Sequence, residues 1–243
     1  MAETLAGNLD AVRGRIAAAA RRSGRAPESV TLVGVSKTMP AERLREAIAA
    51  GLRDLGENKV QEARDKVGPV GPGARWHLVG HLQGNKANQA ARIFDVVHSI
   101  DGVDLLDRLE RGAQAAGRKI DALVQADLAG EATKSGAPPD AIDAILERAA
   151  GCNAVAVRGL MILPPYEEDP ERSRPWFRRL RELGETLAGR HPKLALRELS
   201  MGMTGDFEVA IEEGATLVRV GRALFGERIT THAGAGARPG ETS

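Results

Sequence analysis

Lys37 is the residue whose type and surroundings most directly suggest chemistry. It follows an apolar run at residues 32–35, and Pro40 then opens a helical pattern at residues 42–50, so the lysine lies where a strand turns into a helix. Loops in this position carry the functional residues of many α/β proteins. A lysine there can form a Schiff base as a nucleophile, although a solvated lysine at a strand end would give the same pattern.

Two glycine-containing loops near the other end of the sequence could bind an anion. One runs from Ser200 to Thr204 around Gly202 and the other surrounds Gly221, and each lies between an expected strand and an expected helix. Glycine lets the backbone come close to a ligand, and unpaired N–H groups at helix starts attract negative charge. Either loop alone could be a tight turn, with Thr204 as a helix cap, but both together favour a phosphate site to which Ser200 or Thr204 adds a hydroxyl.

Arg219 is the third chemical candidate. It lies between Val218 and Val220, so strand alternation points it away from the face that these two valines share. An arginine within a strand needs a partner, which could be an acidic structural neighbour or a ligand. Pyridoxal 5'-phosphate needs an amine, an anion cradle and a partner for its ring nitrogen, and Lys37, the two loops and Arg219 are candidates for these roles.

The rest of the sequence predicts the elements that would position these residues. Strands and helical patterns alternate eight times, which is typical of a single (β/α)8 TIM barrel. An extra N-terminal helix at residues 5–22 precedes the first strand. An open doubly wound sheet would require a glycine-rich phosphate loop after the first strand, where this sequence has Ser36, Lys37 and Thr38. The expected strands are residues 29–37, 52–56, 76–81, 94–100, 122–127, 155–163, 197–200 and 216–221, and the expected helices include 57–67, 85–93, 103–116, 139–150, 204–213 and 222–225.

These elements make one domain, the barrel of residues 1–230. Residues 68–73, which are rich in glycine and proline, are expected to form a loop. Residues 231–243, rich in glycine and alanine, are expected to be a disordered C-terminal tail.

Composition excludes several classes of function. The 243 residues include 34 Lys and Arg and 33 Asp and Glu, so the net charge of +1 provides no field for nucleic acid or a membrane surface. Aromatic residues make up only 3%, the single cysteine is Cys152, and the sequence has neither a signal peptide nor a membrane span. His77 and His81 are too far apart on a strand to share a metal and are expected to form local hydrogen bonds. We therefore expect a cytoplasmic monomer that binds no nucleic acid, membrane or metal.

With these residues in view, the chain resembles the pyridoxal phosphate homeostasis protein family, whose barrel is similar to that of the alanine racemases. The resemblance covers nearly everything from Leu5 to Arg228. Its motifs are VGVSKT at residues 33–38, GEN at 56–58, WHLVGHLQGNK at 76–86, VRGLM at 157–161, LSMGMTGD at 199–206 and VRVGRALFG at 218–226.

The resemblance implies a set of cofactor-binding residues. Lys37 would bind pyridoxal 5'-phosphate covalently as a Schiff base, with Asn58 beside the cofactor and Arg219 facing the pyridine nitrogen. Ser200, Gly202 and Gly221 would hold the phosphate, and Met201, Thr204 and Arg222 of the same two loops would also belong to the cofactor-binding residues. Two positions depart from the usual pattern, since Thr204 stands where serine is usual and Arg222 stands where a small hydroxyl residue is usual. The guanidinium of Arg222 would either bind the phosphate or point away from it.

The same residues bear on catalysis. An arginine keeps its proton, so a ring nitrogen facing Arg219 would stay unprotonated and the cofactor would be a poor electron sink. Racemisation would need a second acid or base, which the racemases take from a separate β domain, and the only tyrosine here is Tyr166 in a loop. We therefore expect a non-catalytic protein that buffers the cofactor or delivers it in transient contacts with apoenzymes. The alternatives are a pyridoxal-phosphate-dependent racemase or lyase and a cofactor-free Schiff-base aldolase.

Overall fold

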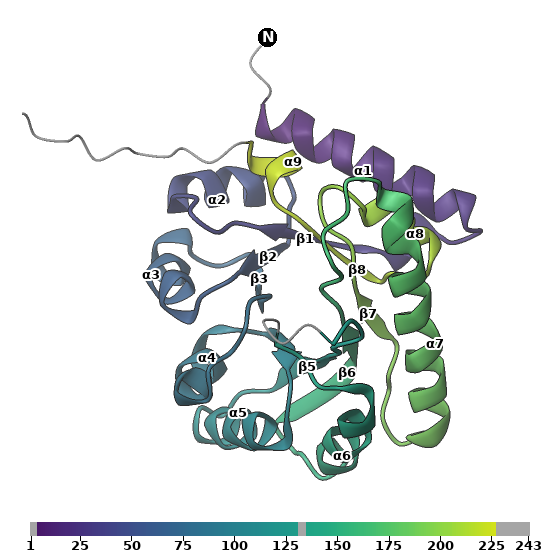
Figure 1. Cartoon of the computed structure of the whole chain (residues 1–243). Coiled ribbons are helices and arrows are strands. Elements are labelled where there is room, and N and C mark those ends of the chain that lie inside the picture. Colours follow the sequence, from purple (N-terminus) through teal and green to yellow (C-terminus); the bar gives the residue numbers. More distant parts are fainter. Residues whose placement is uncertain (1–3, 131–134, 227–243) are drawn as a thin grey trace, which may run out of the picture.

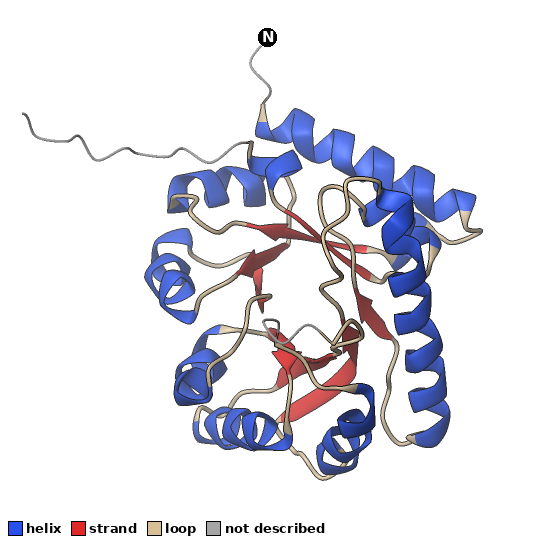
Figure 2. Cartoon of the chain, in the orientation of Figure 1, coloured by secondary structure: helices blue, strands red, loops and turns tan. Residues whose placement is uncertain are grey.

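The alternation of strands and helices closes into a barrel. The computed structural model describes residues 4–130 and 135–226, and within them eight parallel strands form a closed ring in the order β1 to β8. Figures 1 and 2 show this ring of strands with helices around its outside. The predicted (β/α)8 barrel is thus confirmed. The strands are β1 Thr31–Val35, β2 Asp54–Glu57, β3 Arg75–Leu78, β4 Val96–Ile100, β5 Ile120–Gln125, β6 Val155–Met161, β7 Glu198–Ser200 and β8 Leu217–Val220.

The helices occupy the positions that the apolar periodicity predicted, with shifts of a few residues at their ends. The α-helices are α1 Leu5–Arg22, α2 Ala41–Ala49, α3 Val60–Val70, α4 Ala87–Ile93, α5 Val103–Ala115, α6 Pro139–Ala149, α7 Arg174–Arg190, α8 Phe207–Glu212 and α9 Arg222–Phe225. Short 3-10 helices, which the sequence did not reveal, are η1 Pro27–Ser29, η2 Gly84–Lys86 and η3 Pro170–Ser173.

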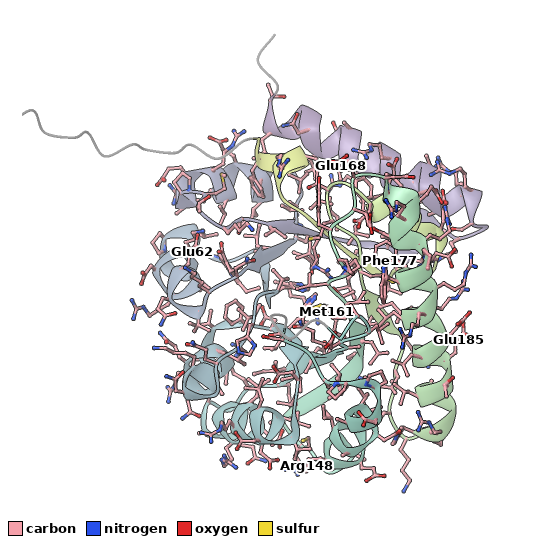
Figure 3. All side chains as sticks on the ribbon, in the orientation of Figure 1. Glu62, Arg148, Met161, Glu168, Phe177 and Glu185 are labelled. Atoms are coloured by element: carbon pink, nitrogen blue, oxygen red, sulfur yellow. The ribbon has the colours of Figure 1, made fainter. Side chains whose placement is uncertain are left out.

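Both faces of the strands are buried, as a parallel barrel requires. Side chains on the outer face, such as Leu55 and Leu78, pack in the cluster that also holds the helices. Side chains on the inner face, including Val33, Leu123 and Met161, form a second, smaller cluster. Figure 3 labels Met161 within the ring of strands. The interior is thus a packed core and supports a site at its end.

The strand register brings sequence-distant residues to one end of the barrel. β1 lies between β2 and β8, with Val35 opposite Gly56 and Gly34 opposite Val220. Because all strands run in the same direction, the residues that follow β1, β2 and β8 meet at the carboxyl end of the barrel.

The predicted N-terminal helix is present and covers the last two helices. In Figure 1, α1 lies across the outside of the barrel beside α8 and α9. The Arg15 guanidinium is 2.8 Å from the Glu208 carboxylate on α8, and Asn8 Nδ2 donates to the Leu224 carbonyl oxygen on α9 at 3.1 Å. The first contact holds α8, and the second holds α9, the helix that directly follows the second glycine loop.

The expected loop at residues 68–73 begins three residues too early. α3 continues through Pro69 to Val70. A proline has a helical φ and removes only one hydrogen bond, and burial of Val70, which is 5% exposed, favours the extra turn. The Pro69 carbonyl oxygen accepts a hydrogen bond from Arg45 Nη1 at 2.6 Å. The predicted tail at residues 231–243 and the last four residues assigned to the barrel, 227–230, lie outside the described residues.

Candidate functional site

A cavity of about 900 Å³ opens at the carboxyl end of the strands. It lies within the size range of small-molecule sites. It brings together six of the nine residues that the sequence predicted for cofactor binding: Lys37, Asn58, Thr204, Arg219, Gly221 and Arg222. Ser200, Met201 and Gly202 do not line it. Tyr166 and His81 lie at this cavity as well.

The turn that carries Lys37 is held from the side of α3. Lys66 Nζ on α3 donates to the Ser36 carbonyl oxygen at 2.8 Å, and the Thr38 N–H donates to a Glu62 carboxylate oxygen. Figure 3 labels Glu62 on this helix. Thr38 has a φ of 67°, a left-handed conformation that is unfavourable for a β-branched residue. The residues on both sides of Lys37 are therefore fixed, and this fixes the direction in which the lysine leaves the backbone.

Glu57, at the end of β2, lies at the centre of this support. Its side chain is fully buried, and its Oε1 accepts hydrogen bonds from Ser36 Oγ at 2.7 Å and from Lys66 Nζ at 2.8 Å. Its Oε2 has no hydrogen-bond partner within the described residues. Burial raises the pKa of the Glu57 carboxyl, and the bonds from Lys66 and Ser36 act in the opposite direction.

The loop after β7 has a conformation that requires glycine. Gly202 has a φ of 88°, and a Cβ atom there would lie 2.6 Å from the Ala210 Cβ and 2.8 Å from the Phe207 Cα. The Met203 N–H is taken by Asp206 Oδ1 at 2.7 Å. Although Gly202 does not line the cavity, its turn presents Thr204 and the following residues there.

Backbone donors in both glycine loops are available to an anion. Among the described residues, the N–H groups of Thr204, Gly205 and Arg222 form no hydrogen bond, and all three residues line the cavity. Gly221 lies so close to β1 that a Cβ atom would be 3.1 Å from the Val35 carbonyl oxygen. The two loops thus provide backbone N–H groups, the Thr204 hydroxyl and the Arg222 side chain.

Arg219 is a buried cation in the wall of the cavity. It is 4% exposed, and its Nη1 and Nη2 donate to Ser200 Oγ at 2.5 Å and to the Ile162 carbonyl oxygen at 2.8 Å. Loss of hydration lowers the pKa of Arg219 to about 10, while the nearby Asp206 carboxylate acts in the opposite direction. The guanidinium therefore stays charged at neutral pH. Its hydrogen-bond partners among the described residues are a hydroxyl and a carbonyl, and within that part of the chain no carboxylate accepts from its remaining donors.

Ser200 lies beneath the cavity, inside the barrel. Its hydroxyl contacts Arg219 and also His98 Nδ1 at 2.8 Å, and the residue is fully buried. This position differs from the expected one beside a phosphate. Met201, also fully buried, belongs to the helix-facing core.

Two buried histidines continue from Ser200 through the barrel interior. His98 Nε2 is 2.9 Å from His77 Nδ1, and His77 Nε2 is 2.9 Å from Asp54 Oδ1. Burial lowers the pKa of His77, and burial lowers that of His98 well below the ordinary value. The local hydrogen bonding expected of His77 is present, whereas sequence reasoning overlooked His98. Strand alternation could have placed both histidines on the inner face.

The remaining candidates lie at the mouth of the cavity. Tyr166 is 86% exposed. His81 Nδ1 is 3.5 Å from Asp101 Oδ2 in the loop after β4. Within the described residues, no group of three or more His, Cys, Asp or Glu side chains could hold a metal ion. In the same part of the chain, no helix is both long and apolar enough to cross a membrane.

Three kinds of functional group surround this one cavity. An amine on a fixed turn faces an opening that is also lined by a buried guanidinium, charged at neutral pH, and by the N–H groups of Thr204, Gly205 and Arg222. An amine can form a Schiff base with a carbonyl compound. The guanidinium and the backbone N–H groups can donate hydrogen bonds to acidic or electron-rich groups of the same compound.

Comparison with known proteins agrees with this geometry. The family described as alanine racemase, N-terminal domain, matches residues 7–229. The pyridoxal phosphate homeostasis protein of Aquifex aeolicus is 43% identical over 221 residues, which are 90% of this chain and 96% of that protein. The protein of the same name from Escherichia coli K12 is 39% identical over 231 residues, or 92% of this chain and 97% of that protein.

Solved structures show the same relationship. PipY of Synechococcus elongatus with PLP bound has a TM-score of 0.81 and 38% identity, covering 92% of this chain and 100% of that chain. D-threonine aldolase from Filomicrobium marinum, with a TM-score of 0.69 at 19% identity over 89% of this chain and 60% of that chain, shares only the fold. The chain therefore belongs to the pyridoxal phosphate homeostasis protein family, within the group of barrels that match the N-terminal domain of alanine racemase.

Proposed function

We propose that this protein binds pyridoxal 5'-phosphate reversibly, through a Schiff base on Lys37, and buffers or delivers the cofactor without turning over an amino-acid substrate. The observation that carries the proposal is that Lys37, Arg219 and the free N–H groups of the glycine loops line one cavity. The relatives' names and the PLP-bound PipY structure identify the cofactor.

The residues present fit each part of the cofactor. Lys37 supplies the amine for the aldehyde carbon, and Asn58 lines the cavity beside it. The N–H groups of Thr204, Gly205 and Arg222, together with the Thr204 hydroxyl, would hold the phosphate. Gly202 contributes through the turn that it permits. Ser200 and Met201, which were predicted to touch the cofactor, are given no direct contact in this proposal because neither lines the cavity.

Arg219 supports a binding role over a catalytic one. The cofactor supplies carbanion stabilisation to enzymes when its ring nitrogen is protonated. A guanidinium that is charged at neutral pH has no acceptor, so a ring nitrogen facing it must accept the hydrogen bond and remain unprotonated. In this proposal the protein thus binds the cofactor with its ring nitrogen unprotonated, which is its less reactive form.

The visible absorbance of the purified protein tests the binding proposal. Adding pyridoxal phosphate should produce the band of a Schiff base, and borohydride reduction followed by peptide mass mapping should find the adduct on Lys37. Lys37→Ala should lose the band and the adduct, and bind the cofactor at least tenfold more weakly. Lys193→Ala, which changes an exposed lysine before β7, should behave like the wild type. An adduct on another lysine, or no band at all, would refute the proposal.

A second candidate function is a racemase or lyase that uses Lys37 as its base. Tyr166 favours it because its side chain is at the mouth of the cavity, where a second acid or base would be needed. Its exposure of 86% argues against a tuned catalytic group. Amino acids should change the spectrum and yield product if this candidate is correct, and Tyr166→Phe should then abolish turnover. We expect no product from the wild type or from Tyr166→Phe.

Delivery of the cofactor to apoenzymes by a monomer completes the proposal. Sedimentation should give one species near 25.8 kDa. An apoenzyme mixed with the loaded protein should regain activity faster than by release into solution, since transient contact shortens the path of the cofactor. Equal rates of reactivation would contradict delivery and leave buffering.

A further inference from the structure

A line of buried polar side chains crosses the barrel interior and ends at Arg219. We call Asp54, His77, His98 and Ser200 the histidine network; they come from β2, β3, β4 and β7. Asp54 begins β2, so the network starts near the amino-terminal end of the barrel, opposite the cavity. The side chains of the two histidines and of Ser200 are fully buried, and that of Asp54 is 18% exposed.

The hydrogen-bond direction of the network is determined by its two ends. Arg219 can only donate, so Ser200 Oγ accepts from it and has its own proton left for His98 Nδ1. His98 then carries its proton on Nε2 and donates to His77 Nδ1, and His77 donates from Nε2 to Asp54. A carboxylate can only accept, so the Asp54 end requires the same two tautomers.

This agreement leaves every member satisfied while both imidazoles are neutral. Reversing the His77 tautomer alone would set its Nδ1–H against the Nε2–H of His98 and leave Asp54 without its donor. Reversing the His98 tautomer alone would set two ring nitrogens without protons against each other and leave the Ser200 proton without an acceptor. Each unsatisfied group costs roughly 1–3 kcal/mol. Desolvation also keeps both imidazoles neutral, as the lowered pKa values of His77 and His98 indicate. Hydrogen bonds that point in one direction polarise one another, which strengthens the bond from Arg219 to Ser200.

We propose that His98 and His77 are positioning residues for the cofactor, because through Ser200 they fix the orientation in which Arg219 presents its free N–H groups to the ring nitrogen. This inference rests on the proposed function. The Ile162 carbonyl oxygen holds Nη2, and the histidine network holds Nη1. Two fixed nitrogens define the plane of a guanidinium, so loss of the network lets the group turn about its remaining contact.

The wild-type protein without cofactor provides the first test. Nitrogen-15 NMR of labelled histidines should show His77 and His98 as neutral Nε2–H tautomers at pH 7. Adding pyridoxal phosphate should shift the His98 signals, whereas those of His191, which is bonded to Asp143 on the outer side, should not move. A charged imidazole, an Nδ1–H tautomer, or a His98 signal that does not respond to bound cofactor would overturn the inference.

Variants of His98 provide the second test. His98→Gln keeps an acceptor for Ser200 and a donor for His77, so its affinity for pyridoxal phosphate should remain within about threefold of wild type. His98→Leu removes both bonds and should bind about tenfold more weakly, which corresponds to about 1.4 kcal/mol. Leu123→Ala, a substitution in the interior cluster on β5, disturbs packing but removes no hydrogen bond of the network, and should change affinity by less than about twofold.

The outcomes separate this inference from the proposed function. Failure of the wild type to bind pyridoxal phosphate would refute the proposed function, and the tautomers measured without cofactor would still test the geometry. Normal binding by His98→Leu, or an equal loss in Leu123→Ala, would show that the histidines serve only the stability of the core. Unfolding of His98→Leu would leave the NMR measurement and His98→Gln to decide.

Discussion

The ammonium group of Lys66 donates to the carbonyl oxygen of Ser36 at 2.8 Å and thereby binds the backbone immediately before Lys37. The same ammonium contacts Glu57 Oε1 at 2.8 Å and Glu62 Oε1 at 2.7 Å. Its three donors therefore join β1, β2 and α3 behind the proposed Schiff-base lysine. A second lysine thus supports the first without lying in the cavity.

Lys66→Met should destabilise the protein strongly. It leaves the fully buried Glu57 carboxylate without its cation, and removing one member of a buried ion pair costs about 3 kcal/mol or more. Denaturant unfolding measures this loss directly. The Lys37 turn should also become more mobile, so amide hydrogen exchange of Thr38 should accelerate.

Two further variants control this prediction. Arg64→Met changes an exposed cation of α3 that pairs with the exposed Asp65, and should cost less than about 1 kcal/mol. Adding Glu57→Gln to Lys66→Met removes the unpaired charge and should restore part of the stability. Additive losses in the double variant would show that the two side chains do not act as a pair.

Gly202→Ala should distort the loop after β7, whereas Gly205→Ala should not. The φ of 88° and the 2.6 Å approach to the Ala210 Cβ leave no room for a methyl group at residue 202, while a Cβ atom at residue 205 meets nothing within 4 Å. We expect a loss of about 1–3 kcal/mol in unfolding free energy for Gly202→Ala. Its affinity for pyridoxal phosphate should fall as well. Equal effects of the two substitutions would contradict the assigned role of Gly202.

The sequence was sufficient to predict the barrel fold and the position of the residues at the strand ends. Period-two and helical patterns located every strand, and the parallel arrangement then placed Lys37, Asn58 and Gly221 at one end. Arg219 could be assigned to the interior because it alternates with Val218 and Val220 along one strand.

Contacts between elements could not be predicted in the same way. The phosphate contact expected of Ser200 came from its place in a glycine loop, but strand pairing turns its hydroxyl toward His98, 102 residues earlier in the chain. Lys66 looked like one of several charges on a polar helix until the fold brought it to Ser36. Such pairings depend on barrel register and strand tilt, which local periodicity does not contain.

The histidine network should make stability depend on pH. His77 and His98 have lowered pKa values in the folded protein, so below about pH 6.5 the unfolded chain takes up protons that the folded chain does not. The free energy of unfolding should therefore decrease as the pH is lowered below about 6.5, by up to about 2.7 kcal/mol per pH unit for the two groups together. Above neutrality, the contribution of the two histidines should be constant. Denaturant titrations between pH 5 and 8 measure the slope.

The double variant His77→Gln, His98→Gln isolates this contribution. It removes both titrating groups but keeps hydrogen-bonding side chains, so in the same titration its stability should decrease less steeply than that of the wild type between pH 6.5 and pH 5. Glu57, whose pKa is raised, is common to both proteins and cancels in the comparison. Identical slopes for the variant and the wild type would mean that the two histidines take up protons equally in both states.

Arg222 should add to phosphate affinity through its side chain as well as its backbone. It lines the cavity next to Gly221 and is exposed, so its guanidinium can reach a bound dianion, but solvent screens the attraction. Arg222→Ser should weaken binding of pyridoxal phosphate about fivefold at low salt, roughly 1 kcal/mol, and should leave binding of pyridoxal, which lacks the phosphate, unchanged. Arg21→Ser, at an exposed arginine of α1, controls for net charge. The deciding quantity is the ratio of the affinities for pyridoxal phosphate and for pyridoxal, measured by absorbance titration at low and high salt. If the Arg222 side chain points away from the phosphate, Arg222→Ser should leave that ratio at its wild-type value.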